Sequence, residues 1–511
     1  MSKFTIFRNA FANLCRGGAT AFVTLLLPPF LTRILSQDTY GTWLLILQLG
    51  TYVSLFDFGV QTAVGRFVAH CTELGDTKQR DSIVSTAIAI LASVSSLAIV
   101  GVSILAWQLP HLFKDMPPEL HQDAQVALLL VGGSLCVSLP FTVFGAIFIG
   151  LQRYDIPAWI IGTSKLLGGI FVVIVAHSSH SIVMMAIVMG ATNLFAGFWQ
   201  FVAYKKMASH ILVSVHLLSK SAAIDIVQYC SSLVVWTISG ILVSSLDGVI
   251  IGYFDYKSLA YYALAASLTT FIVGIQGSVF SSILPDAAAL GARGDREGLG
   301  ELLIATTRYA VVILIITSLP LIICTKPILS VWVGVNYAVH TAQLLQLLVV
   351  ANFIRQLAGP YAMIAMAVGE QKKIILSPLI EGIINVTISI LVTKQIGVIG
   401  VAIGTMIGGS VSIFGHFFYN LPRTKSIYVP HIKHVFYAIL KPLISVVPGI
   451  TYMLLFANQD NYKFDASSIF SLALVSILTM CILYGFGMTQ AEKQKCILLL
   501  KRKLNLARLS N

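Results

Sequence analysis

The sequence predicts an all-α polytopic membrane protein of about 14 transmembrane helices, arranged as two parallel six-helix lobes and a C-terminal helix pair. Three observations support this fold class. Hydrophobic residues make up 57% of the 511 residues and charged residues only 11%, whereas soluble domains carry about 25% charged residues. Apolar runs of membrane length recur along the chain. A shift of 219 residues superimposes the first six runs on the next six.

The internal repeat is supported by motifs as well as by apolar runs. Gly75-Asp76 aligns with Gly294-Asp295, and the segment 150–153 (GLQR) aligns with 369–372 (GEQK). One ungapped register over this length indicates a duplicated bundle, and such bundles are typical of carriers that bind substrate between two halves. Each copy has an even number of helices, so both copies enter the membrane from the same side. The copies are therefore expected to be parallel.

The apolar runs give the spans in chain order. In the first copy we expect spans at 12–34, 42–65, 82–107, 124–149, 157–176 and 182–204. In the second copy we expect spans at 222–247, 259–284, 303–325, 341–368, 374–393 and 397–420, and two more follow at 435–457 and 468–487. The chain then divides into a lobe at 1–210, a lobe at 211–430, a helix pair at 431–490 and a basic amphipathic tail at 491–511.

Loop charges set the orientation of these spans. With the N-terminus inside, the cytoplasmic segments carry roughly four times as many Lys and Arg residues as the opposite side, which is the bias of the positive-inside rule. We therefore expect both termini in the cytoplasm, with the linker 205–220 acting as a cytoplasmic hinge between the lobes. Basic loops facing anionic lipid also account for the net charge of +12 without any nucleic-acid partner.

The sequence lacks the motifs of several catalytic classes. It contains neither the phosphate loop G-x-x-x-x-G-K-[ST] nor the zinc motif H-E-x-x-H, and its Cys and His residues do not cluster with metal-ligand spacing. His416 lies deep in a span, where a packed or backbone-bonded imidazole is the simpler interpretation. We therefore expect no cofactor and no metal, and transport without covalent chemistry.

Polar residues follow helical spacing on four spans that are repeat mates. Asp57 and Gln61 lie on the second span, and Asp225 and Gln228 lie on the seventh. Stripes of Gly, Ser and Thr on the first, second, seventh and eighth spans have a simple explanation, since small residues let membrane helices pack closely. Carboxylate and amide groups within a bilayer instead face a wet cavity or a partner. These four residues are candidates for the lining of a cavity between the lobes.

Charged residues inside or beside the spans extend this candidate site. The cations are Arg16, Arg66, Lys165 and Arg355, and a cation held in a wet cavity would bind a phosphate or an acidic sugar. Glu381 aligns one turn from Lys165, so an ion pair between these two residues is the structural alternative. Asp57, Asp225 and Glu381 are candidates for coupling transport to an ion.

Several N-terminal motifs resemble a known family. They are Pro29–Ser36, Tyr40–Trp43, Phe56–Gly59 with Arg66 close behind, and Gly75-Asp76. This series resembles the start of polysaccharide and O-antigen flippases of the Wzx type, in the multidrug/oligosaccharidyl-lipid/polysaccharide exporter superfamily. The resemblance implies a cavity lined mainly by the first, second, seventh and eighth spans. It implies an undecaprenyl-diphosphate-linked oligosaccharide that is flipped from the cytoplasmic to the periplasmic leaflet of a bacterial inner membrane. Glycan polymerase and chain-length proteins would be partners.

Three alternatives share part of this pattern. A multidrug or cation antiporter of the superfamily typically has a carboxylate on the first span, where this chain has only Arg16. A lipid II flippase usually places several arginines in the first two spans, and this chain has Arg16 and Arg66. A membrane glycosyltransferase or glycan polymerase usually has a large exterior loop, whereas the longest exterior loop predicted here is 107–124.

Overall fold

The computed structural model describes residues 3–244, 246–429, 431, 433–452, 474–475, 477–487 and 493. Within these ranges, side chains are described for all but 3–16, 19, 22, 232–236 and 244. All regular elements in the described residues are helical, and 12 helices among them are long and apolar enough to cross a membrane. The chain is thus an all-α multi-pass membrane protein, which confirms the predicted fold class. The count of 14 spans stays a prediction, since the last expected span and the tail lie largely outside the described residues.

Residues pack into two compact units. Unit 1 comprises 1–267 and 382–404, and unit 2 comprises 268–381 and 405–511. The units follow packing rather than the repeat, so the lobes 1–210 and 211–430 and the pair 431–490 remain predictions.

Unit 1 contains the first ten α-helices and parts of three others. They are α1 (Lys3–Ile34), α2 (Gln37–Thr51), α3 (Val60–Leu74), α4 (Thr77–Leu112), α5 (Pro118–Ser138), α6 (Thr142–Gly150), α7 (Asp155–Ser179), α8 (Ile182–Met207), α9 (Lys220–Ser244) and α10 (Asp247–Phe254), with the start of α11 (Leu259–Phe280), the end of α18 (Leu376–Ile396) and the start of α19 (Ile399–Phe414). Short 3₁₀ helices lie at Tyr52–Asp57 (η1), Val215–Leu217 (η2) and Tyr256–Ser258 (η3). The segment 247–259, which we expected to be a polar break, is therefore mostly helical.

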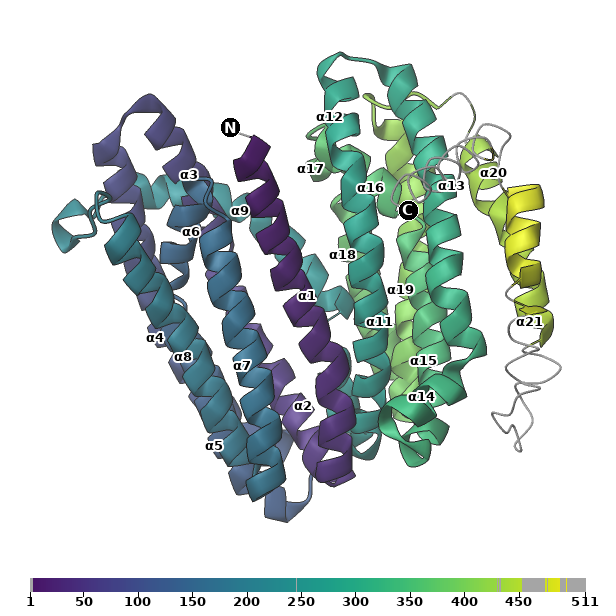
Figure 1. Ribbon diagram of the computed structural model, residues 1–511, viewed down its shortest axis with the longest axis horizontal. Helices are drawn as coiled ribbons and strands as arrows, with labels where there is room; N and C mark the ends of the chain where they lie inside the picture. The colour runs from purple at the N-terminus through teal and green to yellow at the C-terminus, as the bar shows by residue number, and fades with distance from the viewer. Residues whose placement is uncertain are drawn as a thin grey trace, which may run out of the picture. The chain divides into compact units, whose positions relative to one another are not determined.

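The long helices of unit 1 pack as neighbours in the order α4, α5, α8, α7 and α1 (Figure 1). The shorter helices α3 and α6 pack on each other, and α3 also contacts α4 and α9. The apolar core of this region joins α3, α4, α6, α8 and α9, and Ala208 and Ile211 of the following linker are buried in it. This core fixes α3 and α9, which carry most of the candidate site residues of unit 1.

Unit 2 is built around α13 and α15. Its helices are α12 (Leu284–Ala292), α13 (Arg296–Ile323), α14 (Thr325–Val333), α15 (Val335–Gln356), α16 (Gly359–Ala367), α17 (Gln371–Ile374), α20 (Lys433–Leu443) and α21 (Val447–Tyr452), with the remainder of α11, α18 and α19. Short helices of other types are η4 (Ser281–Ile283), η5 (Gly415–Asn420), η6 (Leu421–Arg423), η7 (Ile444–Val446) and η9 (Leu483–Gly487). Its apolar core joins α11, α12, α13, α15, α16 and α20.

Several spans are broken rather than continuous. The second span is divided into α2, η1 and α3, because Phe58 and Gly59 adopt left-handed conformations with φ of 47° and 83°. The fourth span is divided between α5 and α6, and the tenth between α15 and α16. In the 219-residue register these two breaks nearly coincide. Irregular backbone at membrane depth is tolerated where protein or a wet cavity surrounds it.

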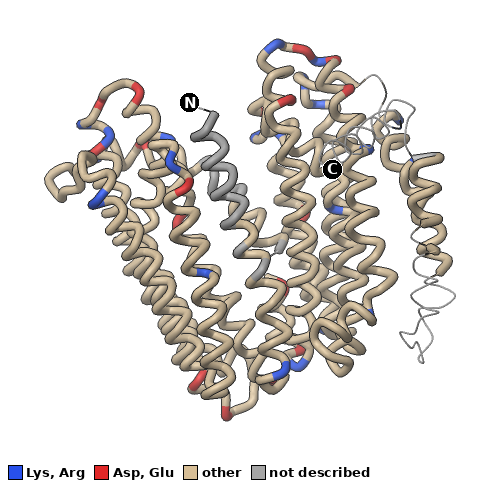
Figure 2. The backbone as a smooth tube through the Cα atoms, viewed as in Figure 1, with Lys and Arg blue, Asp and Glu red and all other residues tan. Residues whose placement is uncertain are grey.

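Charged side chains gather at the ends of the helices, and only a few lie along them (Figure 2). Because charge is costly within hydrocarbon, this distribution suits a protein whose helices cross a bilayer. The few intramembrane charges are the ones whose surroundings bear on function.

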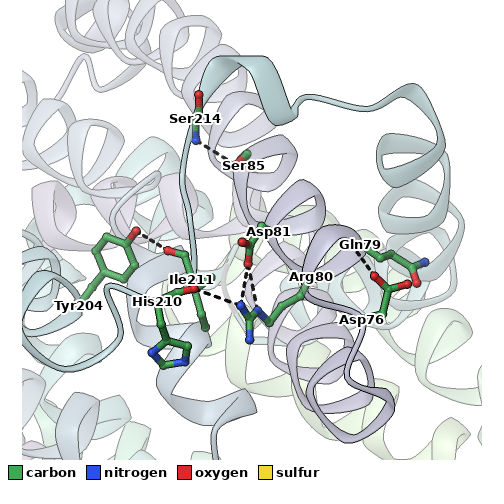
Figure 3. A network of polar contacts seen from close by, with 9 residues as sticks. All are labelled: Asp76, Gln79, Arg80, Asp81, Ser85, Tyr204, His210, Ile211 and Ser214. Carbon is green, nitrogen blue, oxygen red and sulfur yellow. Dashed lines mark hydrogen bonds and ion pairs between the residues drawn. The ribbon is translucent and has the colours of Figure 1, made fainter.

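The linker between α8 and α9, which lies within the hinge expected at 205–220, is attached to α4. We call residues 208–219 the strap. The Arg80 guanidinium donates to the His210 carbonyl at 3.2 Å, and the Ser214 N–H donates to Ser85 Oγ at 3.2 Å (Figure 3). The Tyr204 hydroxyl donates to the Ile211 carbonyl at 2.7 Å. The strap is therefore held as part of unit 1.

Candidate translocation site

Asp57 lies at the break in the second span and stabilises the helix that follows. Its carboxylate accepts from the backbone N–H of Gln61, with Oδ1 at 3.3 Å. The first N–H groups of a helix have no partner within the helix, so a carboxylate here acts as a cap. Asp57 is half-buried. A structural role for this carboxylate therefore stands beside the predicted cavity role.

The Gln61 side chain lies near the same glycine as a second intramembrane amide, Gln200, which was not among the predicted residues. A Cβ on Gly145 of α6 would lie 3.8 Å from Gln61 Nε2 and 2.5 Å from Gln200 Oε1, so both amides lie around this glycine. Gln200 is only 6% exposed, and its Oε1 has no hydrogen-bond partner in the described part of the chain. The signal was present, because an amide within an apolar span normally has a partner or faces water.

Arg66 and Tyr229 form a contact between the second and seventh spans, two of the four spans with predicted polar stripes. The Arg66 guanidinium carbon lies 4.8 Å from the centre of the Tyr229 ring, a cation–π distance, and the Arg66 side chain is exposed. Asp225 lies one turn before Tyr229 on α9 and is half-buried, while Gln228 is exposed. The contact between α3 and α9 thus brings Arg66 close to the helix face of Asp225. Tyr229 was not among the predicted residues.

Lys165 extends from α7 toward the polar stripe of the first span. Its ammonium donates to Thr20 Oγ1 at 3.4 Å, and α7 packs along α1. The Lys165 side chain is exposed. The side chain of Arg16, one turn earlier on α1, lies outside the described residues.

In unit 2, Glu381 lies among polar groups of the same unit. The Glu381 carboxylate is 5% exposed, accepts a hydrogen bond from Ser412 and lies within electrostatic range of Arg355. Arg355 is half-buried on α15, and its Cβ lies 3.3 Å from the position of a Cβ on Gly409. Lys165 belongs to unit 1. The double replacement that separates pairing from substrate binding is therefore Arg355 with Glu381.

One turn from Arg355, Asn352 belongs to a buried amide network. Its Nδ2 donates to Gln276 Oε1 at 3.0 Å, and Gln276 Nε2 donates to Thr317 Oγ1 at 2.8 Å. Gln276 is fully buried. Gln276 aligns with Asp57 in the 219-residue register, so the repeat could have identified it. The two copies place different polar groups at the same level of the second and eighth spans.

His416 is buried and packed, as expected, but its recorded polar contact is with a side chain. Its Nδ1 lies 3.2 Å from Asn420 Nδ2, and its ring lies edge-on to Tyr361 with centres 5.5 Å apart. Among the residues that the structure describes, no group of three or more His, Cys, Asp or Glu side chains could hold a metal ion.

Two aligned segments of the repeat meet each other inside unit 1. Thr42 is hydrogen-bonded to the Tyr256 hydroxyl, and the Tyr261 hydroxyl donates to Gln37 Oε1 at 2.8 Å. A shift of 219 residues turns Gln37 into Tyr256 and Thr42 into Tyr261, so each contact is the counterpart of the other. Such reciprocal contacts characterise a two-fold interface. We call these four residues the clasp.

The comparisons with known proteins agree with this geometry. Residues 6–288 match the model of a family described as polysaccharide biosynthesis protein. The chain is 23% identical over 453 residues to the uncharacterized membrane protein EpsK of Bacillus subtilis (strain 168), covering 87% of this chain and 88% of that one.

Solved structures show a similar fold at low identity. A lipid II flippase MurJ in an inward closed conformation aligns with a TM-score of 0.68 and 16% identity, covering 94% of this chain and 99% of that one. An inward-facing multidrug resistance transporter of the MATE family, in the MOP superfamily, aligns with a TM-score of 0.62 and 13% identity, covering 84% and 99%. These likenesses establish the fold.

Proposed function

The chain belongs to the polysaccharide biosynthesis protein family, and on this premise we propose that it flips an undecaprenyl-diphosphate-linked oligosaccharide repeat unit from the cytoplasmic to the periplasmic leaflet of a bacterial inner membrane. Family and fold make the chain a membrane transporter of the flippase type rather than an enzyme. The repeat unit would supply O-antigen, capsule or exopolysaccharide synthesis, with glycan polymerase and chain-length proteins acting next.

The chemistry of such a substrate explains what the protein must provide. Sugar hydroxyls and a diphosphate lose their water when they enter hydrocarbon, and an unpaired polar group there costs several kcal/mol. Polar side chains along the path replace that water, while the polyprenyl tail can stay in lipid. Exposed polar and cationic groups on α3, α7 and α9 suit this task.

The observation that carries the proposal is the exposed Arg66 on the face of Tyr229. A guanidinium presents a planar set of donors that can bind two phosphate oxygens at once, and the Tyr229 ring holds it in place. Asp225 and Gln228 on the same segment of α9 offer hydrogen-bonding groups for sugar hydroxyls. We assign the diphosphate to Arg66 and the first sugars to α9.

The clasp supports alternating access. Its contacts close one end of the pair formed by α2 and the start of α11, so a path open at that end requires them to separate. Reciprocal contacts between aligned segments also support two parallel copies related by a two-fold axis along the membrane normal. Hydrogen bonds between hydroxyl and amide groups are suitable for a closure that must open repeatedly, because each contributes only about 0.5–1.5 kcal/mol.

Ion coupling would involve Asp57, Asp225 or Glu381. Asp57 caps α3, and Glu381 is held by Ser412 and lies near Arg355. Asp225 is half-buried beside the Arg66–Tyr229 pair, so we propose Asp225 first as the carboxylate that couples transport to an ion.

Reconstituted protein tests the role of Arg66. In proteoliposomes containing a fluorescent undecaprenyl-diphosphate oligosaccharide, we expect Arg66→Gln to reduce flipping at least tenfold, and Arg66→Lys to retain part of it because a positive charge remains. Lys78→Gln, which removes an exposed cation at the start of α4, is the matched control. Normal flipping by Arg66→Gln would contradict the assignment. Flipping of lipid II but not of the oligosaccharide would favour a peptidoglycan role.

Cysteine labelling tests the proposed orientation, with both termini in the cytoplasm. Glu119→Cys should react with an impermeant thiol reagent added outside intact spheroplasts, whereas Lys78→Cys should react only after lysis. The opposite pattern would reverse the orientation and the direction of transport.

A further inference from the structure

The backbone of the strap is fixed against unit 1 along its length. Besides the contacts to Arg80 and Ser85, the Ser219 N–H donates to Thr86 Oγ1 at 3.2 Å. Arg80 and Asp81 form a buried ion pair at 3.0 Å, with side chains only 6% and 9% exposed. Ala208 and Ile211 are fully buried in the apolar core. These contacts decide which side of the strap faces outward.

The outward side of the strap is strongly apolar. Val215 is 78% exposed, Leu212 59%, Leu218 45% and Val213 39%. Four large apolar side chains on one short segment form a patch that water would not favour. Because the inward contacts already hold the backbone, the patch cannot turn inward to bury itself. It requires a surface to cover it.

Cations surround this patch. Lys205 and Lys206 end α8, Lys220 begins α9, and all three are exposed. Residues 205–220 contain no Asp or Glu, and the acidic Asp81 beneath the strap is paired with Arg80. The Lys205 ammonium lies 5.9 Å from the centre of the Tyr204 ring. An apolar patch on a segment whose only charged residues are cations is complementary to an anionic lipid surface.

The strap follows a helix whose exposed surface is apolar. On α8, Phe198 is 55% exposed and Trp199 48%, and Met207 at the end of the same helix is 51% exposed. Aromatic residues near the end of a span are typical of the membrane interface. The strap therefore begins where the lipid-facing surface of α8 ends.

We propose that the strap is an interfacial membrane anchor, which inserts Leu212, Val213, Val215 and Leu218 below the headgroups of an anionic leaflet. Lys205, Lys206 and Lys220 then lie at the level of the lipid phosphates. The anchor sets the depth of the α3–α4–α8–α9 end of unit 1 in the bilayer. It depends on the multi-pass fold and not on the identity of the transported glycan.

Fluorescence quenching by lipid tests the anchor. In a cysteine-free version of the full chain, Val215→Cys and Leu212→Cys are each labelled with an environment-sensitive fluorophore and placed in nanodiscs containing phosphatidylglycerol. Thr77→Cys, at the exposed first residue of α4, is the matched control. We expect lipids brominated near the headgroup end of the acyl chain to quench both strap positions at least twofold more than Thr77.

The charge requirement is tested in the same system. Replacing phosphatidylglycerol by phosphatidylcholine should reduce quenching at Val215, and Lys205→Gln with Lys206→Gln should abolish the difference between the two lipids, since each lysine at an anionic surface contributes roughly fivefold in affinity. Quenching at both strap positions no stronger than at Thr77 would overturn the proposal and indicate a soluble protein as the occupant. Equal quenching in phosphatidylglycerol and in phosphatidylcholine would overturn the preference of the strap for anionic lipid.

Discussion

The strap packs on α4, and the segment that corresponds to it in the second copy of the repeat packs on α13. The two copies attach these equivalent segments to their helices by different contacts. In the first copy the Arg80–Asp81 pair holds the strap, and the aligned residues in the second copy are Leu299 and Gly300. There the chain crosses the helix so closely that a Cβ on Gly300 would lie 1.8 Å from the Tyr428 carbonyl oxygen. In the first copy a buried ion pair attaches the linker to the helix. In the second copy a glycine without a side chain lets the linker pack directly against the helix backbone.

The turns that precede α4 and α13 have, by contrast, the same backbone geometry in both copies. Gly75 and Gly294 have φ of 71° and 68°, a left-handed conformation that glycine adopts without strain. Asp76 and Asp295 then cap α4 and α13, with N–H to Oδ1 distances of 2.9 and 2.8 Å. A turn that backbone geometry dictates allows few substitutions, whereas packing between a helix and a linker can be achieved in several ways.

Replacing Gly300 should give the largest effect. Because the blocking atom is a backbone oxygen, no side-chain rotation can relieve the clash, and we expect Gly300→Ala to abolish most of the folded protein. Size-exclusion chromatography of detergent-solubilised protein measures this. The control is Gly277→Ala on α11, where a Cβ would meet no atom within 4 Å. Equal yields of folded protein from the two variants would contradict the close approach of the Tyr428 carbonyl to Gly300.

Removing Arg80 should have the next largest effect. Arg80→Ala leaves the buried Asp81 carboxylate without its cation, and removing one partner of a buried pair costs about 3–5 kcal/mol. The double variant with Asp81→Ala should recover part of this loss in a thermal unfolding assay. Arg153→Ala is the control, because Arg153 also pairs with an aspartate at 3.0 Å but its side chain is 36% exposed. Because the Arg153 side chain reaches solvent, although that of Asp155 is only 11% exposed, we expect its removal to cost less than the removal of Arg80.

Variants of Arg355 distinguish a structural role of its charge from a role in substrate binding. Arg355→Ala should lower protein abundance, because the buried Glu381 carboxylate would lose a nearby cation, a cost of roughly 1–3 kcal/mol or more. Adding Glu381→Ala should restore abundance, and the double variant is then assayed for glycan export. Full export would exclude Arg355 from substrate binding. Normal abundance with absent export in the single variant would instead favour a direct role in transport.

The helix caps should give the smallest and most similar effects. Asp76→Ala and Asp295→Ala each remove a carboxylate from the first turn of a long helix, which costs about 1 kcal/mol. Thermal unfolding of the two variants should agree within error, because the cap geometry is the same in both copies. A clear difference between the two variants would show that the two caps contribute unequally to stability.

The spans could be predicted because their length and apolar composition suffice to identify them. The breaks within the spans could not, because they depend on local backbone conformation, such as the left-handed Phe58 before Gly59. The polar stripes drew attention to Asp57 and Gln61, but the capping role of Asp57 appears only when the break is known. Gln200 and Tyr229 were not singled out, although Gln200 is an amide within an apolar span and Tyr229 lies one turn from Asp225 on α9.

The basic loops show a second limit of sequence reasoning. Arg80 contributed to the predicted orientation only as one positive charge among many. Its pairing with Asp81 and its bond to the His210 carbonyl depend on the fold of the strap, which composition does not reveal. Likewise, the alignment of Glu381 with Lys165 suggested a pair, and the nearness of Ser412 and Arg355 to Glu381 had no signal in the sequence.

The leaflet distribution of the lipid-linked glycan in cells depleted of this protein tests the central claim most directly. Completed oligosaccharide units on the undecaprenyl carrier should accumulate in the cytoplasmic leaflet, where an impermeant glycan-modifying enzyme added to spheroplasts cannot reach them until the cells are lysed. Restoring the protein should make them accessible from outside within minutes. Incomplete units, or completed units that are accessible without the protein, would contradict a flippase and point to a role in glycan assembly.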